Sequence, residues 1–274
     1  MAKHSDVVVL CVGLNETLEG EEGDTGNSYA SGDKADLNLP APQRKLMEAV
    51  LATGKPVIVC LMTGSAMDLS LAQEKAAAVL QLWYPGARGG KAVADILFGD
   101  CSPSGKLSVT FYRSLEELPD FEDYSMKGRT YRYMEGEALY PFGYGLTYGD
   151  VRVESASVVS QDAASRDVVV CAKVKNAGSV STDDVVQIYV KDPASAYAVP
   201  NHSLCAFHRV SLQAGESKEI QIKVPGDAFL VVDEEGRFQK GSDKCLLYVG
   251  TGQPDRRTEA LSGKKSVEIA VEFV

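Results

Sequence analysis

The sequence predicts an α/β domain, with a mostly parallel sheet and flanking helices, followed by an all-β sandwich. Two continuous apolar runs, at residues 6–12 and 56–62, are typical of strands buried on both faces of a parallel sheet. Amphipathic helical segments with short connections alternate with such runs, which favours a sheet covered by helices. Beyond Gly149 the apolar residues recur with a period of two, which is typical of strands in a sandwich.

The first part of the chain is expected to alternate strands and helices. In order, we expect a strand at 6–12, a helix from Pro40 to Gly54, a strand at 56–62, a short helix at 71–75, a strand at 78–83 and a helix around 92–97. Proline is tolerated in the first turn of a helix and glycine is common just after the last turn. Trp83 and Tyr84 end the third strand, where we favour packing in the core or between domains over stacking on a sugar.

The pattern changes between residues 102 and 148. A short strand is expected at 106–111, and the remainder is rich in tyrosine, phenylalanine and glycine but poor in regular elements. This composition differs from that of flexible Gly/Ser linkers. We therefore expect a strap that docks on neighbouring domains.

The predicted domains are an α/β domain at 1–111, a connecting strap at 112–148 and a β-sandwich at 149–274. The sandwich strands are expected at 151–159, 168–174, 185–190, 219–224, 245–250 and 267–273. Glycine-containing turns separate some of these strands, at spacings typical of a sandwich.

A long acidic loop follows the first strand, from Gly13 to Pro40. Loops of this length are uncommon unless they are functional or disordered. In open α/β sheets, ligands bind on loops beyond the carboxyl ends of the strands. The acidic residues of the loop are Glu16, Glu19, Glu21, Glu22, Asp24, Asp33 and Asp36. The residues alone leave two interpretations open, a functional site and a solvated acidic loop.

The composition argues against several classes of function. The formal net charge of -10 argues against binding to nucleic acid, which needs clustered Lys and Arg. No apolar run approaches the roughly 20 residues that span a membrane, so no membrane partner is expected. The start of the chain lacks the apolar core of a signal peptide, so we expect a cytoplasmic protein, unless the natural N-terminus lies elsewhere.

Nothing in the sequence indicates a bound metal or cofactor. The six cysteines and three histidines show no spacing typical of a metal site, and the cysteines are expected to be reduced and mostly buried. No GxGxxG motif follows the first strand, which argues against dinucleotide binding. We therefore expect no cofactor and no metal.

Motifs in consistent order cover essentially the whole chain. The earlier ones are GLNETLEGEEGD, GDKADLNLP, GKPVIVCLMTGSAMDLS, QLWYPGARGGKAVADILFGDCSPSGKLSVTFYRS, GRTYRY and LYPFGYGLTY. In them the chain resembles glycoside hydrolase family 3, and most closely its bacterial β-xylosidase and β-glucosidase branch. The later DDVVQIYVKDP, FHRVSLQAGESKEIQIKV and FLVVDEEGRF resemble the fibronectin type III-like domain of that family.

The resemblance implies a retaining β-glycosidase with three parts: a (β/α)8 barrel that carries the nucleophilic Asp, an α/β sandwich domain and a fibronectin type III-like domain. This chain matches only the last two parts, and a barrel needs about 250 residues of its own. The implied partners are a β-linked xyloside or glucoside substrate and a barrel, from the same enzyme or from a separate chain. Homo-oligomerisation is left open.

The resemblance also implies a general acid/base Glu in an E-x-E-G motif after the first strand of the sandwich domain. Glu21 falls on this acid/base position and Glu19 on the earlier acid. Glu22 stands where the motif has Gly, and Lys34 stands where the family often has Arg. These departures keep Glu22 and Glu19 as alternates to Glu21.

Two other functions remain as alternatives. The lack of a nucleophile and the predicted β-sandwich suit a non-catalytic module for carbohydrate binding or assembly. A self-sufficient hydrolase that uses two acids of the loop is a weaker alternative.

Overall fold

The computed structural model describes residues 1–15, 18–19 and 36–273. The chain divides into two compact units. The α/β unit comprises Met1–Ala94 and Phe111–Asp120, and the β unit comprises Asp95–Thr110 and Phe121–Val274. The domain bounds expected from the sequence, 1–111, 112–148 and 149–274, remain a prediction. Among the described residues, no helix is both long and apolar enough to cross a membrane.

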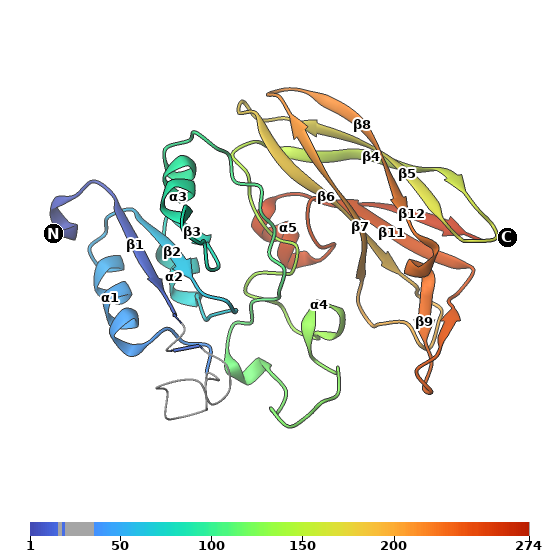
Figure 1. The fold of residues 1–274 in the computed structure, drawn as a ribbon, viewed down its shortest axis with the longest axis horizontal. Helices are drawn as coiled ribbons and strands as arrows, with labels where there is room; N and C mark the ends of the chain where they lie inside the picture. Colours follow the sequence, from blue (N-terminus) through green and yellow to red (C-terminus); the bar gives the residue numbers. More distant parts are fainter. Residues whose placement is uncertain (16–17, 20–35, 274) are drawn as a thin grey trace. The chain divides into compact units, whose positions relative to one another are not determined.

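The α/β unit contains a three-stranded parallel sheet in the order β1-β2-β3 (Figure 1). The strands are β1 (Val8–Gly13), β2 (Val57–Met62) and β3 (Ala78–Gln81). The intervening helices are α1 (Ala41–Leu51) and α2 (Ser70–Lys75), and α3 (Gly89–Leu97) follows β3. Alternation of strands and helices around a parallel sheet confirms the predicted fold of this part of the chain.

The two apolar strands of this sheet are buried to different extents. In the central strand β2, Val59, Cys60 and Leu61 are fully buried, as the continuous apolar run predicts. In β1, Leu10 and Val12 are buried, but Val9 is 48% exposed and Cys11 is also exposed. The prediction that residues 6–12 are buried on both faces is therefore wrong. Among the described residues β1 pairs only with β2, so it is an edge strand. The exposure of Val9 and Cys11 shows that one face of this strand is uncovered in the described part of the chain.

Two predicted strands end early or do not form. β3 ends at Gln81 and not at residue 83, because Trp83 has φ 53°, a left-handed conformation that an extended strand cannot contain. The segment at 106–111 forms no ladder in the described structure. Leu107 instead exchanges backbone hydrogen bonds with the turn at Gly143 and Tyr144, accepting from the former and donating to the latter.

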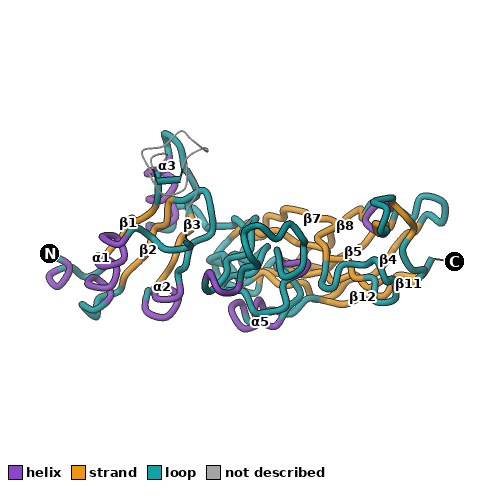
Figure 2. The backbone as a smooth tube through the Cα atoms, turned by 90° about the horizontal axis from the view of Figure 1, so that it is seen from below, coloured by secondary structure: helices purple, strands orange, loops and turns teal. Residues whose placement is uncertain are grey.

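The β unit contains a sandwich of two antiparallel sheets, whose strands are orange in Figure 2. One sheet has the order β4-β5-β8 and the other the order β12-β11-β6-β7. The strands are β4 (Val151–Gln161), β5 (Val168–Asn176), β6 (Thr182–Lys191), β7 (Ser203–Leu212), β8 (Ser217–Val224), β11 (Lys244–Gly250) and β12 (Val267–Glu272). Their inward-facing Val, Ile and Leu side chains form one hydrophobic core. The predicted all-β sandwich is confirmed.

Several elements of the β unit are absent from the sequence-based prediction. They are β7, the short pair β9 (Leu230–Val232) and β10 (Phe238–Lys240), and the helices α4 (Thr130–Tyr133) and α5 (Arg256–Ser262). Short 3-10 helices lie at Ala2–His4, Leu115–Glu117 and Gly226–Phe229.

The aromatic strap packs on the sandwich. The Tyr131 ring stacks on Phe142, with centroids 4.2 Å apart, and meets Tyr189 of β6 edge-on at 6.1 Å. The Tyr131 hydroxyl also accepts a hydrogen bond from the Leu204 backbone N–H at 3.0 Å. Burial raises the pKa of Tyr131. The strap therefore packs on the sandwich, while the expectation that it docks on both neighbouring domains stays a prediction.

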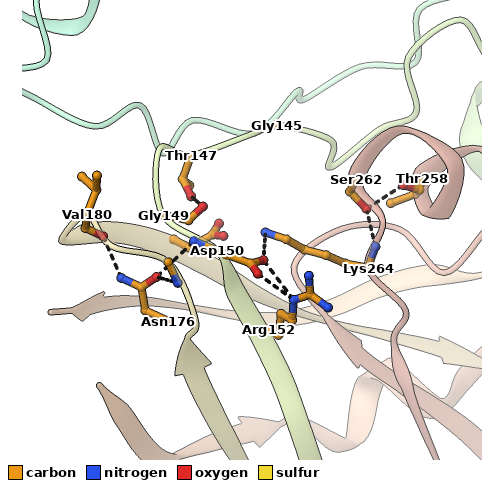
Figure 3. A network of polar contacts seen from close by, with 12 residues as sticks. Gly145, Thr147, Gly149, Asp150, Arg152, Asn176, Val180, Thr258, Ser262 and Lys264 are labelled. Carbon is orange, nitrogen blue, oxygen red and sulfur yellow. Dashed lines mark hydrogen bonds and ion pairs between the residues drawn. The ribbon is translucent and has the colours of Figure 1, made fainter. Parts of the chain in front are cut away.

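A polar network fixes the start of the sandwich (Figure 3). The Asn176 amide oxygen accepts hydrogen bonds from the backbone N–H groups of Asp150 and Gly178, both at 3.0 Å. Its NH2 group donates to the Val180 carbonyl at 2.8 Å. Both carboxylate oxygens of Asp150 accept the single N–H of Arg152 Nε as a bifurcated hydrogen bond, at 3.0 and 2.9 Å. Because Asn176 is fully buried, its contacts satisfy amide groups that water cannot reach, whereas the Asp150–Arg152 pair is partly exposed.

Candidate functional site

A cleft lies at the carboxyl ends of strands β1 and β2, where ligands bind in open α/β sheets. Its volume is about 520 Å³. The lining residues are Cys11, Val12, Gly13, Leu14, Asn15, Leu18, Gln43, Met62, Tyr84, Pro85 and Gly86. The entry to the acidic loop therefore forms one wall of the cleft.

The point where the acidic loop leaves β1 is fixed by close packing. Gly13 donates its N–H to Gln43 Oε1 and accepts from Gln43 Nε2, both at 2.8 Å. The next residue, Leu14, donates its N–H to the Met62 carbonyl at 2.9 Å. Only glycine fits at position 13, because a Cβ there would lie 1.9 Å from the Met62 carbonyl oxygen. The first residues of the loop thus have a defined direction over the cleft.

Glu19 is the predicted site residue that the structure describes. Gly64 donates its backbone N–H to Glu19 Oε2 at 3.2 Å, and the Tyr84 hydroxyl donates to the same oxygen at 2.8 Å. The Ser65 hydroxyl donates to Glu19 Oε1. Both carboxylate oxygens of Glu19 therefore accept hydrogen bonds from the loops that follow β2 and β3.

Tyr84, for which the sequence analysis favoured packing in the core or between domains, lies instead in the candidate site. It lines the cleft, is 52% exposed, and holds its hydroxyl against Glu19. Its peptide neighbour Trp83 has a positive φ, which costs a non-glycine residue roughly 1–2 kcal/mol. The position of Tyr84 directly after a strand of the parallel sheet is the sequence signal that could have placed it beside the acidic loop.

The other predicted site residues cannot be placed in the structure. Glu21 and Glu22 lie outside the described residues, as do Asp33 and Lys34. The structure therefore describes the entry to the acidic loop and Glu19, but not the position assigned to the acid/base. Within the described ranges, no group of three or more His, Cys, Asp or Glu side chains could hold a metal ion.

Comparisons with known proteins identify the family. Residues 1–148, more than half of the chain, match the family described as the glycosyl hydrolase family 3 C-terminal domain. The chain belongs to glycosyl hydrolase family 3. A second match, over residues 184–253, is to the fibronectin type III-like domain. The family resemblance found in the sequence is confirmed, together with both domain types.

Relatives of this family 3 chain include enzymes with two named activities. It is 39% identical to a xylan 1,4-β-xylosidase of Xylanibacter ruminicola over 265 residues, covering 93% of this chain and 30% of the relative. It is 32% identical to a periplasmic β-glucosidase of Salmonella typhimurium, covering 91% of this chain and 33% of the relative. The chain thus spans about a third of the length of these relatives.

Solved family 3 structures have the same fold. A β-glucosidase from Erythrobacter marinus matches with a TM-score of 0.82 and 30% identity, over 100% of this chain and 35% of that protein. A β-glucosidase from Bifidobacterium adolescentis matches with a TM-score of 0.83 and 30% identity, over 99% of this chain and 40% of that protein.

Proposed function

We propose that this chain is the C-terminal portion of a retaining β-glycosidase that hydrolyses terminal β-linked xylosides or glucosides. Glu21 supplies the general acid/base, with Glu22 and, less favoured, Glu19 as its alternates. The nucleophilic Asp lies on a barrel outside this chain. The observation that carries the proposal is the family match over residues 1–148, which includes the whole acidic loop.

The chemistry explains why such a loop suits the reaction. A retaining glycosidase holds two carboxyl groups about 5–5.5 Å apart, one of which attacks the anomeric carbon while the other protonates the leaving oxygen and then activates water. The proton donor must carry its proton near neutral pH, and neighbouring carboxylates favour that protonated form by repulsion. Glu19, Glu21 and Glu22 provide such neighbours within four residues of sequence.

In this proposal the chain supplies one of the two catalytic carboxyl groups. It spans 30% and 36% of the lengths of two β-xylosidase relatives. A barrel of about 250 residues would account for much of the difference. The uncovered face of β1, with Val9 and Cys11 exposed, is the kind of apolar surface that another element normally covers. We therefore expect the chain alone to be inactive.

Reconstitution tests this function. The chain is mixed with the barrel portion of its own enzyme and assayed with aryl β-xyloside and aryl β-glucoside. Activity is expected in the mixture and in neither part alone, and Glu21→Gln should abolish it. Glu22→Gln decides between Glu21 and this alternate, and it should retain most of the activity. Full activity of the Glu21→Gln mixture would contradict the proposal.

The cleft beside Glu19 favours one alternative, a non-catalytic module that binds carbohydrate. A half-exposed tyrosine, Tyr84, lines this cleft, and aromatic rings commonly provide contact surface in ligand sites. Calorimetry of the isolated chain with xylo- and cello-oligosaccharides distinguishes the two functions. Tight binding without a barrel would favour the binding module, and its absence would favour an incomplete enzyme.

A further inference from the structure

The connections that follow all three parallel strands meet at Glu19. Glu19 itself lies in the connection after β1, Gly64 and Ser65 lie after β2, and Tyr84 lies after β3. Glu19 and Tyr84 are 65 residues apart in sequence, yet their side chains are 2.8 Å apart. One carboxyl group therefore joins three loops at the edge of the sheet where the cleft lies.

The geometry around this contact is closely fitted. Gly64 has no side chain, and a Cβ there would lie 2.8 Å from Cε2 of the Tyr84 ring. The positive φ of Trp83 turns the chain between the end of β3 and Tyr84. A strained backbone at a bulky residue persists only where surrounding contacts hold it. The Tyr84 hydroxyl is thus held at Glu19 by features on both sides of it.

We propose that Glu19 is a positioning residue, which joins the start of the acidic loop to the loops after β2 and β3 and leaves proton transfer to Glu21 or Glu22. This proposal rests on the proposed function. A general acid must direct its own O–H at the leaving oxygen of the substrate. Glu19 instead uses both oxygens as acceptors for donors of its own chain, among them a backbone N–H, which can only donate.

The contact between Glu19 and Tyr84 can be tested in the isolated chain by fluorescence. Trp83 is the only tryptophan of the sequence and is the peptide neighbour of Tyr84, so its emission reports on this turn. We expect Glu19→Gln and Tyr84→Phe each to shift the Trp83 emission, and the double variant to add nothing further. Tyr124→Phe, at a 91% exposed tyrosine of the β unit, is the matched control and should leave the emission unchanged. An unchanged emission in both single variants, or a fully additive shift in the double variant, would contradict the contact between Glu19 and Tyr84.

The reconstituted enzyme tests the role of Glu19 in the reaction. Loss of the general acid/base lowers kcat/KM for aryl glycosides with poor leaving groups far more than for those with good ones, because only the former need a proton on the leaving oxygen. On the activated substrates the glycosyl-enzyme then accumulates, and azide restores kcat because it attacks this intermediate without a general base. For Glu19→Gln we expect instead a similar loss of kcat/KM, about tenfold or more, for both kinds of substrate, without rescue by azide on the activated substrate. Tyr84→Phe should show the same pattern in milder form. A loss of kcat/KM confined to poor leaving groups, with azide rescue of kcat on the activated substrate, would make Glu19 the acid and overturn the proposal.

The two experiments distinguish failure of the proposed function from failure of the proposed role of Glu19. A mixture with no activity would contradict the proposed function, and the Trp83 emission of the isolated chain would still decide whether Glu19 ties the loops. An active mixture, with unchanged Trp83 emission in Glu19→Gln and Tyr84→Phe, would contradict only the proposed role of Glu19.

Discussion

Gly13 at the end of β1 and Met62 at the end of β2 lie so close that a Cβ on Gly13 would be 1.9 Å from the Met62 carbonyl oxygen. We expect Gly13→Ala to destabilise the α/β unit by more than about 1 kcal/mol, since alanine also fits poorly at a positive φ. Thermal unfolding measures the change. Gly90→Ala is the control, because Gly90 lies in helix α3 and a Cβ there would meet nothing within 4 Å. Equal stability of the two variants would contradict the close contact.

A buried ion pair in the β unit makes a second prediction. Lys106 Nζ lies 2.8 Å from Asp184 Oδ1, and the two side chains are only 10% and 1% exposed. Lys106→Met leaves the Asp184 charge buried without this cation, which we expect to cost about 3–5 kcal/mol in urea unfolding.

A neighbouring pair provides the control for this prediction. Arg209 and Asp183 form a 2.7 Å ion pair whose side chains are 61% and 35% exposed. Arg209→Met should therefore cost less than about 1 kcal/mol. Similar losses in Lys106→Met and Arg209→Met would show that burial of the Lys106 pair adds nothing to its effect.

The acid sensitivity of the β unit should depend on His202. Burial, and then the positive charge of Lys191, lower the pKa of His202 from 6.5 to about 4. Between these values the unfolded chain binds a proton that the folded chain does not, so stability is complete above pH 6.5 and falls as the pH drops toward 4. We expect His202→Gln to flatten the dependence of the melting temperature on pH in this window. An unchanged slope would contradict the prediction.

The sequence predicts the fold more fully than it predicts burial. The apolar runs at β1 and β2 look alike, but β1 is an edge strand, and a run of apolar residues does not show what covers it. Strand β7 was not predicted because apolar and polar residues do not alternate in its sequence, SLCAFHRVSL. It is an edge strand, and its Phe207 side chain is 68% exposed. The positive φ of Trp83, which ends β3, has no signal in the sequence.

The candidate site was only partly predictable for a related reason. The acidic residues of the loop, their place after the first strand and the family motif are all local features of the sequence. The contact between Glu19 and Tyr84 joins residues far apart in the chain, and only the parallel register of the strands brings them together. The sequence therefore predicts which carboxyl groups are present, and the structure shows what Glu19 contacts.

The most direct test of the central claim is the dependence of kcat/KM on the leaving group for Glu21→Gln in the reconstituted enzyme. If Glu21 is the proton donor, the variant should lose at least about 100-fold in kcat/KM on aryl β-xylosides with poor leaving groups and little on dinitrophenyl xyloside, and azide should raise its kcat on dinitrophenyl xyloside. Unchanged kcat/KM on the poor leaving groups would contradict the claim that this chain supplies its acid/base through Glu21.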